Sequence, residues 1–192
     1  MYTYVVRAVR ADEWASVKAL RLLALRDPVA DLAFYETYDE AVARPDDFWL
    51  ERAAGGDEGA TGARQFVAET ADGAWAGTVT VLVEAAGSVD WAGAAVERLQ
   101  GGVVGVFVRA EHRGAGAIEA LFDAALAWAW SWGAERVRLV VHQDNGRALA
   151  CYRRLGFSPT GVAFEERREI EMAVERPGRA LGEGGSSRAG DV

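Results

Sequence analysis

Short apolar or alternating runs predict seven strands along the chain. Residues 103–108 form a continuous apolar run, which is typical of a strand buried on both faces. Within 75–84, Val79, Val81 and Val83 share one face, as in a strand with a covered side. The seven expected strands span 4–9, 66–70, 75–84, 103–108, 136–141, 157–164 and 169–174.

Helical periodicity fills several segments between these strands. The clearest helix follows Gly116 and carries an apolar stripe that includes Leu121 and Phe122. Gly133 ends this helix as a C-cap. Because helices and strands are interspersed, we expect an α/β layered domain. The other expected helices span 12–27, 30–43, 45–53, 94–99 and 145–155.

The length and composition suit a single domain. The 192 residues are 51% hydrophobic and 26% charged, as in a soluble globular protein that buries its own core. From Pro177 onward the sequence is mostly Gly, Ser and Arg with almost nothing apolar. We therefore expect one domain over 1–176 and a disordered tail over 177–192.

Charge and composition exclude several classes of function. The net charge of −8 argues against nucleic acid, whose phosphates require a basic face. The same charge suits a cationic or amine-bearing substrate, although it also simply favours solubility. With one cysteine and two histidines, the chain can form neither an internal disulfide nor a Cys/His zinc site, so we expect no metal. The chain shows neither a signal peptide nor a run of about 18 apolar residues, so we expect a cytoplasmic protein without membrane association.

A glycine-containing turn joins the apolar strand at 103–108 to the long helix. The first amides of a helix lack intrahelical partners, and with the helix dipole they form an anion site. Gly114 and Gly116 would let the backbone approach an anion closely, and Arg113 adds positive charge. The turn is not a Walker loop, because no Gly-Lys-Ser/Thr follows it. It is not the Rossmann fingerprint either, because Glu119 occupies the third glycine position. A pyrophosphate would fit there, although a glycine-containing turn often only connects two elements and binds nothing.

A second motif follows the strand at 136–141. Asn145 is placed to cap the next helix or to contact an extended ligand, and Tyr152 lies about two turns later on the same helix face. Each residue also has a purely structural interpretation, as a helix cap and as a half-buried core tyrosine. The motif closes with Leu155, Gly156 and Phe157.

The two motifs together resemble the GNAT (GCN5-related) N-acetyltransferase superfamily. That family has an Arg/Gln-x-x-Gly-x-Gly/Ala turn between a strand and a helix, then Asn, a helix with Tyr, and a Gly-Phe ending. Here the turn is Arg113-x-x-Gly116-x-Ile118, with Ile118 in the place of Gly or Ala. The resemblance implies a mixed, largely antiparallel sheet of six to seven strands, with a splayed central strand pair and helices on both faces.

The resemblance also implies an acyl-CoA site. The backbone of Phe107 and Val108 would pair with the pantetheine arm, Asn145 would contact it, and Tyr152 would lie near the sulfur. The implied diphosphate site is the backbone of Arg113, Gly114, Ala115, Gly116, Ala117 and Ile118. The implied activity is transfer of an acetyl group from acetyl-CoA to an amine.

Direct attack by a neutral amine requires a base for its proton and a donor for the developing oxyanion. Tyr152 would protonate or hydrogen-bond the departing sulfur. Cys151 is expected on another face of the helix, which argues against a covalent thiol intermediate. We take Glu84 as the candidate base, and the alternatives are Asp90, His142, Glu36 and Tyr38.

The acceptor would be an amine of a small molecule, a peptide or a protein, selected by the first helices and the connection at 85–102. Trp130 points away from the packed helix face and would serve a homodimer contact. The alternative function is a non-catalytic acyl-CoA-binding sensor or interaction protein of the same fold. A nucleotide-binding module is a third interpretation, in which ATP or NAD would stabilise the chain and coenzyme A would not.

Overall fold

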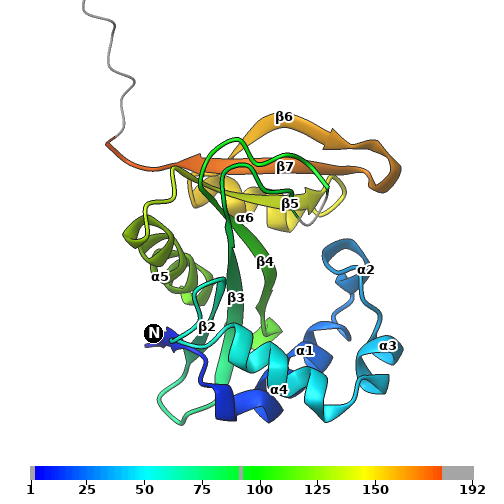
Figure 1. The fold of residues 1–192 in the computed structure, drawn as a ribbon. Coiled ribbons are helices and arrows are strands. Elements are labelled where there is room, and N and C mark those ends of the chain that lie inside the picture. The colour runs from blue at the N-terminus through cyan, green and yellow to red at the C-terminus, as the bar shows by residue number, and fades with distance from the viewer. Residues whose placement is uncertain (1–2, 91–92, 179–192) are drawn as a thin grey trace, which may run out of the picture.

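The computed structural model describes residues 3–90 and 93–178, so most of the expected tail at 177–192 lies outside the described residues. Seven strands form one sheet in the order β1-β2-β3-β4-β5-β7-β6 (Figure 1). This agrees with the mixed α/β layered fold that the sequence predicts. The strands are β1 (Val5–Ala8), β2 (Ala63–Glu69), β3 (Trp75–Glu84), β4 (Gln100–Val108), β5 (Arg136–His142), β6 (Ser158–Phe164) and β7 (Glu169–Glu175).

The sheet is antiparallel except where β4 and β5 run parallel. Their pairing begins at Gln100 with Arg136 and stops at Val103 with Leu139, although both strands continue. Gly105 has a positive φ of 63°, and the register of β4 against β3 shifts beside it. The central pair therefore splays, and one edge of β4 is left without a β5 partner beyond Val103.

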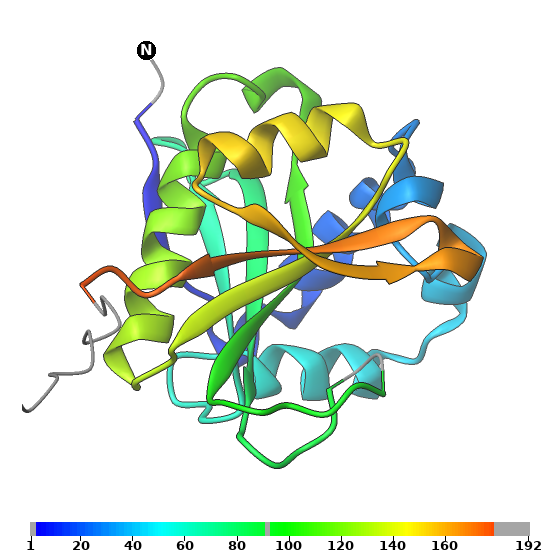
Figure 2. The same cartoon turned by 90° about the horizontal axis from the view of Figure 1, so that it is seen from above.

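Helices cover both faces of the sheet (Figure 2). The long helix α5 and helix α6 pack on one face, and the first four helices pack on the other. The side chains of β2 alternate accordingly, because Phe66 and Ala68 face one cluster and Val67 faces the other. The helices are α1 (Trp14–Ala24), α2 (Ala30–Ala33), α3 (Tyr38–Ala43), α4 (Asp46–Gly55), α5 (Ala117–Ser131) and α6 (Gly146–Arg154).

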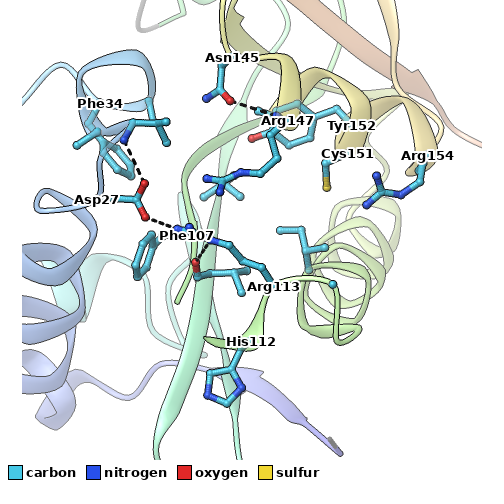
Figure 3. Close-up of a pocket in the computed structure, with 18 residues that line it drawn as sticks. Asp27, Phe34, Phe107, His112, Arg113, Asn145, Arg147, Cys151, Tyr152 and Arg154 are labelled. Atoms are coloured by element: carbon cyan, nitrogen blue, oxygen red, sulfur yellow. Dashed lines mark hydrogen bonds and ion pairs between the residues drawn. The ribbon is translucent and has the colours of Figure 1, made fainter. Parts of the chain in front are cut away.

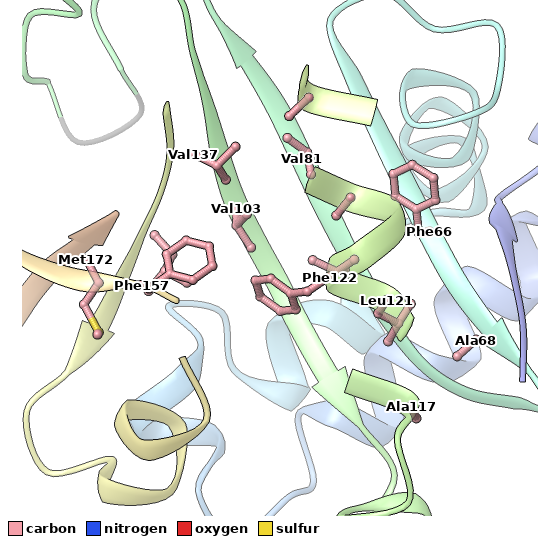
Figure 4. Close-up of a cluster of buried hydrophobic side chains, with 14 of the residues drawn as sticks. Phe66, Ala68, Val81, Val103, Ala117, Leu121, Phe122, Val137, Phe157 and Met172 are labelled. Atoms are coloured by element: carbon pink, nitrogen blue, oxygen red, sulfur yellow. The ribbon is translucent and has the colours of Figure 1, made fainter. Parts of the chain in front are cut away.

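The main hydrophobic core lies between the sheet and α5 (Figure 4). Leu121 and Phe122 are fully buried, as the apolar stripe predicts, and Phe157 packs edge-on against Phe122 at 5.6 Å. Trp130 packs partly buried against this core. The C-cap of α5 is Trp132, and Gly133 follows it with φ of 93°, so the predicted end of the helix at this glycine is confirmed, one residue after the C-cap.

Two expected helices differ from the structure. The stretch 30–43 is broken into α2 and α3, because Phe34 is extended and the chain turns before Thr37 caps α3. The described residues of 94–99 form no helix, and Val89 and Ala95 instead make an isolated bridge within the 85–99 connection.

Candidate functional site

The loop before α5 has the conformation that its two glycines permit. Gly114 has φ of 72° and Gly116, the N-cap of α5, has φ of 92°. A Cβ atom on either residue would meet no other atom within 4 Å, so the backbone conformation rather than crowding favours glycine here. The first amides of the 15-residue helix α5 lack intrahelical partners at its positive end, and the N-cap Gly116 has no side chain to accept from them.

Arg113 is held in place at this loop. Its Nε donates to the Val108 carbonyl at 2.9 Å, and its Nη2 donates to the Asp27 carboxylate. Burial is the largest single effect and would raise the pKa of Asp27, but the hydrogen bonds from Arg113 and the Val29 amide, together with the charges of Arg113 and Arg147, lower the pKa overall. Asp27 thus stays ionised and balances part of the positive charge that the sequence predicts at this turn.

A cavity of about 180 Å³ lies between this loop, β4, α2 and α6 (Figure 3). We call it the donor cavity. Sequence reasoning missed Arg147, which extends into it from the first turn of α6, as well as His112 and Arg154 on its wall. Three arginines therefore line this space, Arg113 from the loop and Arg147 and Arg154 from α6. The predicted residues that line the donor cavity are Phe107, Val108, Arg113, Gly114, Ile118, Asn145 and Tyr152.

Three predicted binding residues do not line this cavity with their side chains. Ala115 and Gly116 belong to the loop backbone, and Ala117 is buried in the main core. Their expected role is a backbone role, which the direction of a side chain does not affect.

Asn145 caps α6, since its Oδ1 accepts from the Ala148 amide at 3.2 Å. It is almost fully buried, yet it also lines the donor cavity. The structural interpretation of Asn145 is therefore correct, and a ligand contact would be additional to it.

Tyr152 projects from α6, and its ring packs against those of Phe122 and Phe157, with centroids 5.8 and 6.2 Å away. Its hydroxyl makes no hydrogen bond with residues 3–90 or 93–178. Burial raises the pKa of Tyr152 well above the usual tyrosine value, so the side chain keeps its proton at neutral pH. It is a proton donor with no assigned acceptor in the described chain.

Cys151 also lines the donor cavity, so the expectation that it faces elsewhere is wrong. Burial raises the pKa of its thiol, which disfavours the thiolate that a covalent mechanism needs.

A second and larger cavity, of about 440 Å³, opens on the other side of Tyr152. We call it the acceptor cavity. It lies between residues of β4 and β5 on one side and residues of α1, α2 and α4 on the other. The two cavities adjoin, because six residues line both: Ala33, Phe34, Val106, Asn145, Ala148 and Tyr152.

The structure does not bring Glu84 to either cavity. Glu84 is 6% exposed at the end of β3, where Arg138 bonds both of its oxygens at 2.8 and 2.9 Å and Gln100 donates at 2.7 Å. Arg138 also pairs with Asp90 at 2.6 Å and with Glu171 at 3.3 Å. Glu84 and Asp90 thus belong to a buried ionic cluster that ties the 85–99 connection to the sheet.

The other expected bases divide between two places. Glu36 and His142 line the acceptor cavity, whereas Tyr38 lies outside both cavities and accepts from the Arg26 guanidinium. Glu169, which the sequence did not single out, also lines the acceptor cavity and accepts from the Tyr35 hydroxyl at 2.7 Å. Its partner lies 134 residues away, so no local signal could have identified it.

The sequence profile of the acetyltransferase (GNAT) family matches residues 18–157, and the chain belongs to this family. A curated protein, "Uncharacterized N-acetyltransferase YobR" of Bacillus subtilis (strain 168), is 41% identical over 59 residues. That match spans 31% of this chain and 24% of the relative.

Solved structures share the fold. The PaiA N-acetyltransferase of Thermoplasma acidophilum, in complex with coenzyme A, superposes with a TM-score of 0.71 at 12% identity, over 91% of this chain and 99% of that one. A GCN5-related N-acetyltransferase from Kribbella flavida gives 0.64 at 19% identity, over 90% and 98%. The spermidine N-acetyltransferase of Vibrio cholerae, in complex with coenzyme A and spermine, gives 0.59 at 19% identity, over 90% and 95%.

The described residues contain neither a cluster of metal-ligating side chains nor a helix that could span a membrane. Over residues 3–90 and 93–178, no three His, Cys, Asp or Glu side chains gather as metal ligands. Within the same ranges no helix has the length and hydropathy to cross a bilayer.

Proposed function

We propose that the protein is an N-acetyltransferase that moves an acetyl group from acetyl-CoA directly to an amine. The observation that carries this proposal is the meeting of two cavities at Tyr152, one below the loop before α5 and one open toward α1 to α4. A donor thioester and an acceptor amine could approach each other there from opposite sides. Positioning of this kind supplies much of the catalysis in such a reaction.

The donor cavity has the groups that coenzyme A requires. Loop amides at the positive end of α5, with Arg113 and Arg147 beside them, suit a diphosphate. Beyond Val103 one edge of β4 has no β5 partner, so its peptide groups are available to the amides of a pantetheine arm. The same edge offers an amide to the oxyanion that develops on the acetyl carbonyl.

In this mechanism the amine nitrogen attacks the acetyl carbon, the new C–N bond forms, and the C–S bond breaks. Tyr152 donates its proton to the departing sulfur or hydrogen-bonds it, and regains any donated proton from solvent. The proton of the attacking amine passes, directly or through water, to a carboxylate of the acceptor cavity, for which Glu36 and Glu169 are the candidates. Glu84, held by Arg138 outside both cavities, is not part of this proposal.

Two measurements test the proposal together. Acetyl-CoA at 100 times its Kd should stabilise the fold by about 2.7 kcal/mol, read as a rise in melting temperature, whereas ATP and NAD should not. Thiol release from acetyl-CoA should then depend on an added amine. Binding without turnover for any amine would refute the enzymatic proposal and favour an acyl-CoA sensor.

A further inference from the structure

The acceptor cavity is more positive than the rest of the molecule. Four arginines line it against three carboxylates, whereas the whole chain has a net charge of −8. A cavity built to hold a polycation would be expected to have the opposite balance, because like charges in a partly desolvated site repel strongly. The lining charges are Arg21, Arg44, Arg52 and Arg167 against Asp31, Glu36 and Glu169.

Three of the four arginines already have an anionic partner. Arg21 donates to Glu36 at 3.1 Å, and Arg44 approaches the other oxygen of Glu36 at 3.6 Å. Arg167 lies 3.6 Å from a Glu169 oxygen and stacks over the Tyr35 ring, also at 3.6 Å. Arg21 and Arg44 therefore share the single charge of Glu36, and Arg167 has that of Glu169, so each of the three has at least one carboxylate contact.

Arg52 is the exception. It stands on α4 between the fully buried Trp49 and Ala53, and its side chain is partly buried. It makes no hydrogen bond or ion pair with any residue in 3–90 or 93–178. It lines both the acceptor cavity and a small adjoining cavity between α1, α4 and the sheet.

A guanidinium in this position is costly to leave without a counter-ion. Burial lowers the pKa of Arg52, and the nearby charge of Arg21 lowers it further, while Glu36 offsets part of this effect. Arginine nonetheless keeps its proton in proteins, so the charge persists and would be stabilised by an anion. Its planar fork matches a carboxylate in particular, since two parallel N–H groups can bond both oxygens.

The wall of the acceptor cavity near β4 and β5 is apolar. It accommodates a hydrophobic body rather than a second charge. The apolar side chains that contribute to this wall are Leu82, Val103, Val104, Val106, Leu139 and Val141.

We infer that the acceptor is an amine that also carries a carboxylate, an amino acid or an amino-acid-like molecule with an apolar side chain, and that Arg52 binds this carboxylate. The inference rests on the proposed function, because it assumes that the larger cavity receives the acceptor. It sets this chain apart from the Vibrio cholerae structure, whose ligand is the polycation spermine.

Thiol release from acetyl-CoA is measured with the twenty amino acids, their amides, the corresponding decarboxylated amines, and spermidine. The carboxylates that serve as substrates should lose activity when they are amidated. Arg52→Gln should lower kcat/KM for a carboxylate substrate by about 30-fold or more, mainly through KM, because the partly buried charge pair is lost. The variant should have the same kcat/KM as the wild type for the matched amide. Each protein is tested on the same pair of carboxylate and amide, so differences in amine basicity cancel.

Two further variants control the experiment. Arg52→Lys keeps the charge without the fork and should fall between the wild type and Arg52→Gln. Arg98→Gln removes an arginine that pairs with Glu175 at the surface, outside both cavities, and should match the wild type. Arg52→Gln should melt no lower than the wild type, because it removes a charge without a partner.

Equal losses on the carboxylate and the amide, or none on either, would overturn the inference and leave the acetyltransferase proposal standing. If no amine is turned over, the acetyltransferase proposal fails, and ligand binding still decides the inference. In that case, N-acetyl amino acids titrated into the protein with coenzyme A should bind the wild type and not Arg52→Gln. The inference would be overturned if none of the N-acetyl amino acids binds, or if they bind both proteins equally.

Discussion

Replacing Tyr152 with phenylalanine removes one hydroxyl and little else. The ring packs against Phe122 and Phe157, and phenylalanine keeps both contacts. The hydroxyl has no hydrogen-bond partner in residues 3–90 or 93–178, so its loss leaves no described group unsatisfied. We therefore expect the melting temperature to change by less than about 2 °C.

Turnover should respond very differently. A positioned general acid contributes about 10²- to 10⁴-fold to rate, so Tyr152→Phe should raise the barrier by about 3–5 kcal/mol. Because burial raises the pKa of Tyr152, the wild type should show no loss of kcat from its ionisation below about pH 10. The Kd for acetyl-CoA should stay close to that of the wild type.

The assay is thiol release at saturating acetyl-CoA, with melting temperature and Kd measured on the same preparations. Tyr38→Phe is the matched control, since Tyr38 bonds Arg26 outside both cavities and should retain wild-type turnover. Turnover of Tyr152→Phe within about 3-fold of the wild type would remove this hydroxyl from the mechanism.

Three other changes test separate parts of the structure. Gly116→Ala and Gly87→Ala should each cost about 1–2 kcal/mol of stability, because both positions have positive φ and open surroundings. Only Gly116→Ala should also weaken the binding of coenzyme A, measured by calorimetry. Equal Kd values would show that the loop does not hold the diphosphate. Glu84→Gln should lower the melting temperature, because Arg138 loses a charged partner. At temperatures where the variant stays folded, its kcat should equal that of the wild type. A loss of kcat without a loss of stability would restore Glu84 as a candidate base. Partial burial and then the bond to Glu169 raise the pKa of Tyr35 to about 12 from its usual value of 10.0. Stability should therefore fall as pH rises from about 10 to 12, and Tyr35→Phe should reduce that fall in alkaline melts. An identical fall in both proteins would refute this assignment.

Local signals carried the parts of the fold that were predicted correctly. The strand at 103–108 is apolar because it is central, and Gly114 and Gly116 mark backbone with positive φ. Such features depend on a few neighbouring residues, which explains why the loop before α5 could be predicted without a structure. The apolar stripe of α5 is local in the same sense.

The errors came from contacts between distant segments. The periodicity over 30–43 continues through the break at Phe34, where Tyr35 reaches Glu169 on β7 and Glu36 turns toward Arg21 on α1. Glu84 looks like a base because its partner Arg138 is 54 residues away along the chain. Spacing along the chain cannot reveal which charges will neutralise each other across a sheet.

The same limit applies to Arg52 and Arg147. Both look like ordinary exposed helix arginines in the sequence. Only the packed fold places Arg147 in the donor cavity. It also places Arg52 in the acceptor cavity, where Arg52 has no ion-pair partner among the described residues. Motifs thus pointed to seven of the residues that line the donor cavity, whereas sequence reasoning singled out Glu36 and His142 of the acceptor cavity but neither Arg52 nor Glu169.

A crystal structure of the protein with coenzyme A bound tests the central claim most directly. We predict the diphosphate on the amides of residues 113–118, the pantetheine along β4 beyond Val103, and the thiol beside the Tyr152 hydroxyl. Coenzyme A bound at another place, or with its thiol away from the junction of the two cavities, would contradict the claim.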